Sequence, residues 1–471
     1  VCIIGYNRDN DRRVVYLKVL YGKKNVILFS TAILAILIIV FIINSLWSIF
    51  HNVDGDIQQT EIDIYNCFGS YSSKNIALSD IIEKYCEKNP KVKISNTSIS
   101  TDEFYTKLNA DFTADCGADI VIAPPSYDIF QLYKRGYIAP LNTEFTKDAE
   151  WADTFDKNIL RFVTDSGSIY GLPTDIEYIL LFCNTEILKR YGLDTPKSYA
   201  DLKNAVSVIS GSNIVPISFA SNDTDLYLYQ ILTSMLDDDA YSAENRNPNN
   251  GYAQAMEYMK ELYSMGAFAK NYETMSQNDA NNMFLNGSAA MIVTTNSFID
   301  NITQYANTDA KDYTKYINQF EIIAFPSEMQ EDNQTKIVFS TVAYNAGEFT
   351  IFVSKKAYEN KHDEVMELAK YLTKPKALRS YLAQTNDIMS IKYIENKEYK
   401  TRLVANCKLA AETATKFTSM PIDITYRYIW RNQLGKSIPR IFENLLAFDD
   451  VAAKIDDATE SNDYKKRNER D

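Results

Sequence analysis

Residues 170–184 of this 471-residue chain read YGLPTDIEYILLFCN. Pro173, with a glycine two positions before it, predicts a turn at the start of this stretch. The apolar run Ile176–Cys183 is rich in β-branched and aromatic residues, which is typical of a buried strand. Asp175 and Glu177 lie two positions apart, so an extended backbone places both carboxylates on one face.

Strand and helix patterns alternate on both sides of this stretch. Apolar residues keep helical spacing over Leu78–Cys86, and that helix ends before Pro90. Pro375 divides a later helical stretch in two, and Gly287 can cap another helix. This alternation indicates an α/β lobe with a mainly parallel sheet. The runs that predict further strands are Glu61–Phe68, Val92–Ile94, Asp119–Ala123, Ile214–Phe219, Ala290–Val293 and Val342–Val353.

The continuation of the opening stretch carries a resemblance. An aromatic-Gly-Leu-Pro, a polar pair and an apolar run closing on Asn184 are followed by a helix and by GLDTP at residues 192–196. This pattern resembles bacterial extracellular solute-binding proteins of the sugar type, the maltose-binding-protein-like family 1 of ABC importers, from about Glu61 to Asp457. The resemblance implies a two-lobed α/β fold of the periplasmic-binding-protein type II. It also implies a substrate receptor that passes a sugar or oligosaccharide to permease subunits and is not an enzyme.

Two lobes of this kind are joined by a hinge that the chain crosses three times. By resemblance, the crossings fall near Leu172–Pro173, Thr294–Asn296 and Asn345–Gly347. The predicted N-terminal lobe comprises residues 61–172 and 296–345, and the predicted C-terminal lobe comprises residues 173–295 and 346–457. At the second crossing the family has Ala-Met-x-x-x-Gly-x-Trp, whereas this chain lacks both the Gly and the Trp and offers Phe298 as the aromatic residue.

An apolar, uncharged run covers residues 26–50. Its roughly 25 residues suffice to cross a bilayer core of about 30 Å. Basic residues precede the run and acidic residues follow it, so the positive-inside rule predicts a cytoplasmic basic segment at 1–25, a single-pass transmembrane helix at 26–50 and a linker at 51–60. The run is longer than a signal-peptide core, and no cleavage or lipidation motif follows it, which predicts a retained anchor. We expect extracellular lobes on the membrane of a single-membrane (Gram-positive-type) bacterium, and a charged tail at 458–471.

The net charge and the small numbers of cysteines and histidines argue against several functions. The net charge of −13 disfavours nucleic acid, which is recognised by basic surfaces. The six cysteines form no close pair and no zinc-ligand spacing, and only two histidines are present. We therefore expect no metal, no cofactor and no catalytic residue, and a monomeric protein.

Two residues are the main candidates for ligand contact. Glu177 resembles, within Pro-x-x-x-Glu, the acidic residue by which maltose-binding members hold sugar hydroxyls, and a solvated surface charge is the alternative. Trp430 follows Met420-Pro421 by ten residues, as does a Trp that stacks on sugar in those members, and core packing is the alternative. The further candidates, from loops after strands and from neighbouring positions, are Tyr71, Ser126, Tyr127, Asp175, Tyr178, Asp225, Tyr227, Phe298 and Tyr428.

Two other functions remain open at this point. A ligand-sensing ectodomain could use the same fold and signal through the membrane helix, although the short basic N-terminal segment carries no catalytic module. An anchored glycoside hydrolase could use Asp175 and Glu177 as its carboxylate pair. Hydrolysis requires two carboxylates that flank the bond, whereas these two share one face, so the hydrolase is disfavoured.

Overall fold

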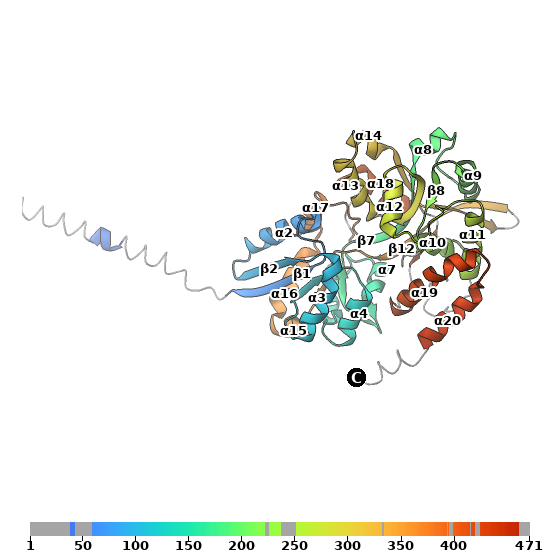
Figure 1. Cartoon of the computed structure of the whole chain (residues 1–471). Coiled ribbons are helices and arrows are strands. Elements are labelled where there is room, and N and C mark those ends of the chain that lie inside the picture. The colour runs from blue at the N-terminus through green and yellow to red at the C-terminus, as the bar shows by residue number, and fades with distance from the viewer. Residues whose placement is uncertain are drawn as a thin grey trace, which may run out of the picture. The chain divides into compact units, whose positions relative to one another are not determined.

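The computed structural model describes residues 38–42, 59–221, 226–236, 251–331, 334–392, 394, 399–414, 416–419 and 424–460 (Figure 1). The chain divides into two compact units, residues 1–59 and 60–471. In the first unit, residues 38–42 are helical, and the transmembrane helix expected at 26–50 otherwise lies outside the described residues. Within the described part of the chain, no helix has the length and apolarity needed to cross a membrane.

The described part of the second unit contains two large sheets and one two-stranded hairpin. The first sheet has the order β2-β1-β3-β13-β6, in which β1 runs parallel to β2 and β3, and β13 runs antiparallel to β3 and β6. Its core includes Ile62 and Ile64 of β1, both fully buried. The strands are β1 (Thr60–Asn66), β2 (Val92–Ser98), β3 (Ile120–Ile122), β6 (Gly171–Pro173) and β13 (Thr350–Val353).

Helices from two distant parts of the sequence pack around the first sheet. Helices α16 and α17, drawn in orange, contact the blue α2, although nearly 300 residues of sequence lie between them (Figure 1). The helices are α2 (Ser73–Cys86), α3 (Thr101–Thr113), α4 (Tyr127–Lys134), α5 (Asn142–Lys147), α6 (Ala149–Ala152), α7 (Lys157–Leu160), η1 (Arg161–Val163), α15 (Lys355–Asn360), α16 (His362–Leu372) and α17 (Pro375–Leu382), with a hairpin of β4 (Thr164–Asp165) and β5 (Ser168–Ile169).

The second sheet is built around the predicted central strand. Strand β7 pairs with β12, β9 and β10, and residues 179–183 in it are fully buried, as expected for an apolar run with neighbours on both sides. The sheet has the order β11-β12-β7-β9-β8, with β10 added to β7 and β14 added to β12. The strands are β7 (Ile176–Asn184), β8 (Val215–Ser218), β9 (Ala289–Thr295), β10 (Phe320–Ile323), β11 (Phe325–Glu331), β12 (Gln334–Ala346) and β14 (Lys416–Ser419).

Capping residues mark the ends of two helices that accompany the second sheet. Ser198 accepts a hydrogen bond from the backbone of Asp201 and caps α9, and Gly287 follows α12 with a positive φ of 78°. Helix α19 contacts α11 and α20, and it also contacts α4 beside the first sheet. The helices are α8 (Thr185–Arg190), α9 (Tyr199–Ile209), α10 (Tyr227–Leu236), α11 (Tyr252–Ser264), α12 (Gln277–Leu285), α13 (Phe298–Thr308), α14 (Tyr313–Asn318), α18 (Arg402–Thr413), α19 (Ile424–Phe442) and α20 (Phe448–Glu460).

The structure corrects the predicted division into lobes. The predicted crossing at Thr294–Asn296 is wrong, because β9 pairs with β7 as far as Thr295 and the following β10, β11 and β12 remain in the second sheet. Residues 320–346 therefore belong with the second sheet rather than with 61–172. Conversely, β13 and helices α15 to α17 belong with the first sheet, because β13 pairs with β3 and β6, α16 and α17 pack against α2, and α15 packs against α16.

Within the described residues, the chain passes between the two sheets at three places. It leaves the first sheet after β6 and enters the second at β7. It returns between β12 and β13, so the predicted strand Val342–Val353 is in fact two strands in different sheets. The third passage follows α17 and leads to α18 and β14.

Candidate functional site

The three passages between the sheets lie side by side. We call residues 174–176, 346–349 and 386–390 the junction. Within it, Gly347 donates its backbone N–H to the carbonyl of Asp175 at 3.0 Å, and Ile176 donates to the carbonyl of Ile388 at 2.9 Å. Ser390 closes the third segment onto the first by donating to the carbonyl of Thr174 at 2.8 Å. The two sheets are therefore joined through three hydrogen-bonded backbone segments.

Asp175 stabilises this junction with its side chain. It is 3% exposed, and its Oδ1 accepts the backbone N–H of Phe349 at 3.0 Å. Burial, reinforced by the nearby charge of Asp387, raises the pKa of Asp175 well above its usual range. A Cβ at Gly347 would lie 2.2 Å from Oδ2 of Asp175, which is why the second segment carries a glycine here. The carboxylate is committed to holding the backbone of the second passage.

Lys74 and its carboxylate partners were not expected from the sequence. Lys74, the second residue of α2, has a side chain 9% exposed, with its Nζ 2.8 Å from Glu348 Oε2 and 2.8 Å from Asp387 Oδ1. Burial alone would lower the pKa of Lys74, but Asp387, Glu348 and Asp300 together raise it well above its ordinary value. A lysine in the first turn of a helix gives no sequence signal for such a role, because exposed lysines are common there.

Glu177 and Tyr178 stand at the first positions of β7 beyond the junction. Glu177 is half-buried and pairs in register with Asn345 of β12, next to a bulge between Ala343 and Asn345. Tyr178 donates its backbone N–H to Oδ1 of Asn296 at 2.6 Å, and burial raises the pKa of its half-buried phenol. Both side chains are therefore positioned on the second sheet within three residues of the junction.

The loops that follow β1 and β3 carry the candidates on the first sheet. Ser126 caps α4 by accepting the backbone N–H of Ile129 at 3.3 Å, and half-buried Tyr127 begins that helix. Asn345 donates its side-chain amide to the carbonyl of Pro125 at 2.9 Å. Because Asn345 also pairs with Glu177, the structure brings the Ser126–Tyr127 loop and Glu177 together from opposite sheets. Tyr71, in the turn after β1, is 98% exposed.

The remaining aromatic candidates have different surroundings. Tyr227 packs its ring edge-on against Tyr344 of β12 at 5.1 Å, next to Asn345. Phe298 is 2% exposed and packs against Phe182 and Phe284 at ring distances of 5.6 and 5.9 Å, so in this conformation its ring belongs to the core of the second sheet.

Three candidates lie partly or wholly outside the described residues. Tyr428 and Trp430 fall on α19, the helix that contacts α4, but their side chains are not among those described. Asp225 lies between two described stretches. The contact between α19 and α4 joins the helix that carries the Trp430 position to the helix that Tyr127 begins.

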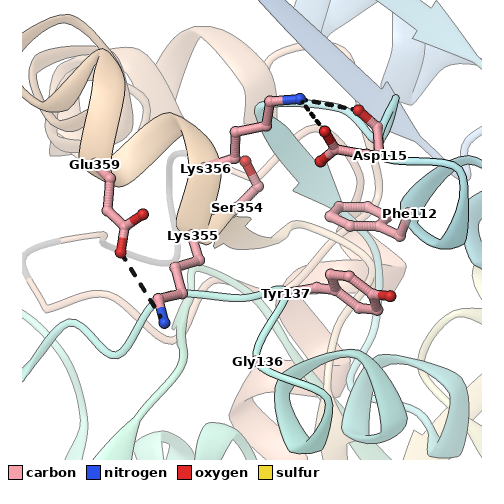
Figure 2. Close-up of a pocket in the computed structure, with 9 residues that line it drawn as sticks. Phe112, Asp115, Gly136, Tyr137, Ser354, Lys355, Lys356 and Glu359 are labelled. Carbon is pink, nitrogen blue, oxygen red and sulfur yellow. Dashed lines mark hydrogen bonds and ion pairs between the residues drawn. The ribbon is translucent and has the colours of Figure 1, made fainter.

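A pocket lies elsewhere on the first-sheet side. It has a volume of about 420 Å³ and its lining includes Phe112 and Tyr137 (Figure 2). Lys356 on its rim already pairs with Asp115 at 3.0 Å, and the opposite charges of Lys355 and Glu359 lie 4.0 Å apart. None of the candidate residues lines it, so it is not the site indicated by the sequence. Among the residues that the structure describes, no group of three or more His, Cys, Asp or Glu side chains is arranged to hold a metal ion.

Comparison with known families decides the class of protein. The family model for bacterial extracellular solute-binding proteins matches residues 71–378, which is more than half of the chain. The chain belongs to this family. Solute-binding proteins bind their solutes without changing them chemically, so this chain is a binding protein and not an enzyme, and the hydrolase alternative falls away. No curated protein sequence matches the chain.

Solved structures share the fold of this solute-binding protein at low sequence identity. The sugar-binding protein MalE from Xanthomonas citri aligns with a TM-score of 0.67 and 14% identity, covering 85% of this chain and 96% of that one. A probable secreted solute-binding lipoprotein from Streptomyces coelicolor aligns with 0.66 and 17%, covering 85% and 98%. A structure from work on xylan utilization by Caldanaerobius polysaccharolyticus aligns with 0.65 and 18%, covering 84% and 99%. These similarities establish the two-lobed α/β fold.

Proposed function

We propose that this solute-binding protein is the substrate receptor of an ABC importer, and that it binds a sugar or oligosaccharide between its two sheets and delivers it to the permease. One observation carries the proposal: Asn345 links the loop at Pro125 on the first sheet to the strand of Glu177 on the second. This link supports a site for polar and aromatic residues of both sheets beside the junction, whose three backbone segments connect the sheets within the described part of the chain. Such a connection allows two lobes to close around a ligand.

The chemistry of these residues suits a carbohydrate. An ionised carboxylate such as Glu177 accepts hydrogen bonds from sugar hydroxyls, and each charged hydrogen bond contributes roughly 1.5–3 kcal/mol. Aromatic rings such as those of Tyr127, Tyr178 and Trp430 suit the flat apolar faces of pyranose rings. Among proteins of the same fold, one is described as a chitin oligosaccharide binding protein and another, RafE, in complex with raffinose.

A thermal-shift screen of the purified protein against a carbohydrate panel tests the proposal. A ligand that binds only the native state raises the melting temperature by mass action, so at least one carbohydrate should do so. Trp430→Ala should then weaken binding of that carbohydrate by about 2 kcal/mol, roughly thirtyfold, and Glu177→Gln should weaken it somewhat less. A panel of mono- and oligosaccharides that leaves the melting temperature unchanged, while another class of solute raises it, would overturn the choice of ligand.

We also propose that residues 26–50 anchor the receptor in the membrane with the N-terminus in the cytoplasm. The support is the apolar run itself, with basic residues before it and acidic residues after it. External protease applied to intact cells should then remove a C-terminal tag while the N-terminal segment stays protected. A C-terminal tag that survives treatment, in cells where a known external protein is digested, would contradict this topology.

A further inference from the structure

Lys74 holds two of the three passages between the sheets. Its Nζ lies 2.8 Å from Glu348 in the second passage and 2.8 Å from Asp387 in the third. Asp387 has a side chain only 8% exposed, and Glu348 one that is 34% exposed. Since Lys74 belongs to α2, these ion pairs fix the first-sheet side of the molecule to the passages themselves.

A third carboxylate reaches Lys74 from the other sheet. Asp300 lies in the first turn of α13, the helix that follows β9 of the second sheet, and its Oδ2 is 3.8 Å from Nζ of Lys74. Its Oδ1 accepts a hydrogen bond from the side chain of Asn386 at 2.8 Å. The pair between Lys74 and Asp300 is therefore the contact in this cluster that joins helices belonging to different sheets.

The distances and exposures separate a fixed part of the cluster from an adjustable part. The two short ion pairs are close to the ordinary hydrogen-bonded distance, whereas 3.8 Å is near the limit for an ion pair. The side chain of Asp300 is also 40% exposed, so water can solvate it when it moves away. Lys74 would keep Glu348 and Asp387 in that event, and no buried charge would be left without a partner.

We propose that Lys74 and Asp300 form an electrostatic latch whose length changes as the two lobes rotate about the junction, and which favours the conformation described here. The proposal rests on the hinge movement of the proposed function. Lys74 keeps its place on the first-sheet side, while α13 moves with the second sheet and carries Asp300 toward it or away from it. Partly exposed ion pairs of this kind are weak, so we expect the latch to change the ratio of two conformations by roughly two- to fivefold.

Removal of the charge at position 300 tests the latch in the absence of any solute. Cys116 is exposed on the first-sheet side, and Val208 on α9 is 44% exposed on the second-sheet side, so a spin label on Cys116 and one on Val208→Cys report the distance between lobes. Cys2 and half-buried Cys86 are replaced by serine in the full-length protein, and the buried cysteines stay. Pulsed electron paramagnetic resonance then gives the distribution of distances between the two spin labels, in the parent protein and in the Asp300→Asn variant.

Asp300→Asn should change the ratio of the two conformations in this distribution by roughly two- to fivefold. Salt at 1 M should change the ratio in the parent protein in the same direction, because it screens the ion pair, and should leave the ratio in Asp300→Asn unchanged. Asp201→Asn is the matched control, since Asp201 is also an acidic residue in the first turn of a second-sheet helix. An unchanged distribution in Asp300→Asn, with native circular dichroism, would overturn the latch. Because no solute is added, that result would leave carbohydrate binding untouched, and a failed carbohydrate screen would leave the latch untouched.

Discussion

Replacing Gly347 by alanine should disturb the junction through one side chain, that of Asp175. Gly347 lies between β12 and β13, and a Cβ there would meet Oδ2 of Asp175 at 2.2 Å and Oδ1 at 2.6 Å. Contacts below 3.0 Å are essentially never seen for a Cβ atom, so the carboxylate must move by close to an ångström. That movement stretches the hydrogen bond in which Oδ1 accepts the N–H of Phe349 at 3.0 Å.

The size of the effect follows from these contacts. Loss of a buried hydrogen bond costs roughly 1–3 kcal/mol, and overpacking in a well-packed interior costs roughly 1–3 kcal/mol. We therefore expect Gly347→Ala to lower the free energy of unfolding by about 3 kcal/mol or more. Gly211→Ala is the matched control, since its Cβ would meet nothing within 4 Å and only its positive φ of 80° is strained. That strain should cost about 1–2 kcal/mol.

Urea unfolding of a double-mutant cycle attributes the cost to Asp175. Asp175→Ala removes the carboxylate that the new methyl group would strike, so Gly347→Ala should cost about 2 kcal/mol less in the Asp175→Ala background than alone. Gly211→Ala should cost the same in both backgrounds, because its surroundings do not include Asp175. Additive effects of Gly347→Ala and Asp175→Ala would refute the steric reasoning.

Two further predictions concern pH and the buried tryptophan. Burial and the charge of Asp387 raise the pKa of Asp175, so the folded protein holds the proton of this carboxyl group more tightly than the unfolded chain does. As the pH rises from about 4, the ordinary pKa of such a group, to 8, the unfolding free energy of the parent protein should therefore fall relative to that of Asp175→Asn, and a rise would contradict this. Trp151 is 7% exposed and donates its indole N–H to Oγ1 of Thr373 at 2.9 Å, so Trp151→Ala should lower the free energy of unfolding in urea by about 3–5 kcal/mol. Calorimetry should show an unchanged affinity for the solute, and weaker binding would contradict a purely structural role for Trp151.

Local features of the fold could be predicted because they depend on neighbouring residues. The apolar run at Ile176–Cys183 forms the central strand β7, since such a run is stable only when covered on both sides. Pro375 begins α17 because a proline at the first helical position needs no N–H partner. Signals of this kind identified strand β7, on which Glu177 and Tyr178 lie.

The pairing of distant strands could not be predicted in the same way. Residues 342–346 of β12 and residues 350–353 of β13 are all buried and mostly apolar, and nothing in their composition indicates that they join different sheets on either side of Gly347. Phe298 was expected at the site because it replaces the family aromatic, whereas its ring packs on Phe182 and Phe284. Asn345 did give a usable signal, since an amide inside an apolar strand needs a partner, and it finds one in Pro125.

The central claim is that the two sheets close on a solute about the three-segment junction. Small-angle scattering of the protein tests it most directly, with and without a carbohydrate that raises its melting temperature. We expect a smaller radius of gyration at saturation, because the lobes approach each other around the bound ligand. An unchanged radius, at a concentration where calorimetry shows the site to be full, would contradict it.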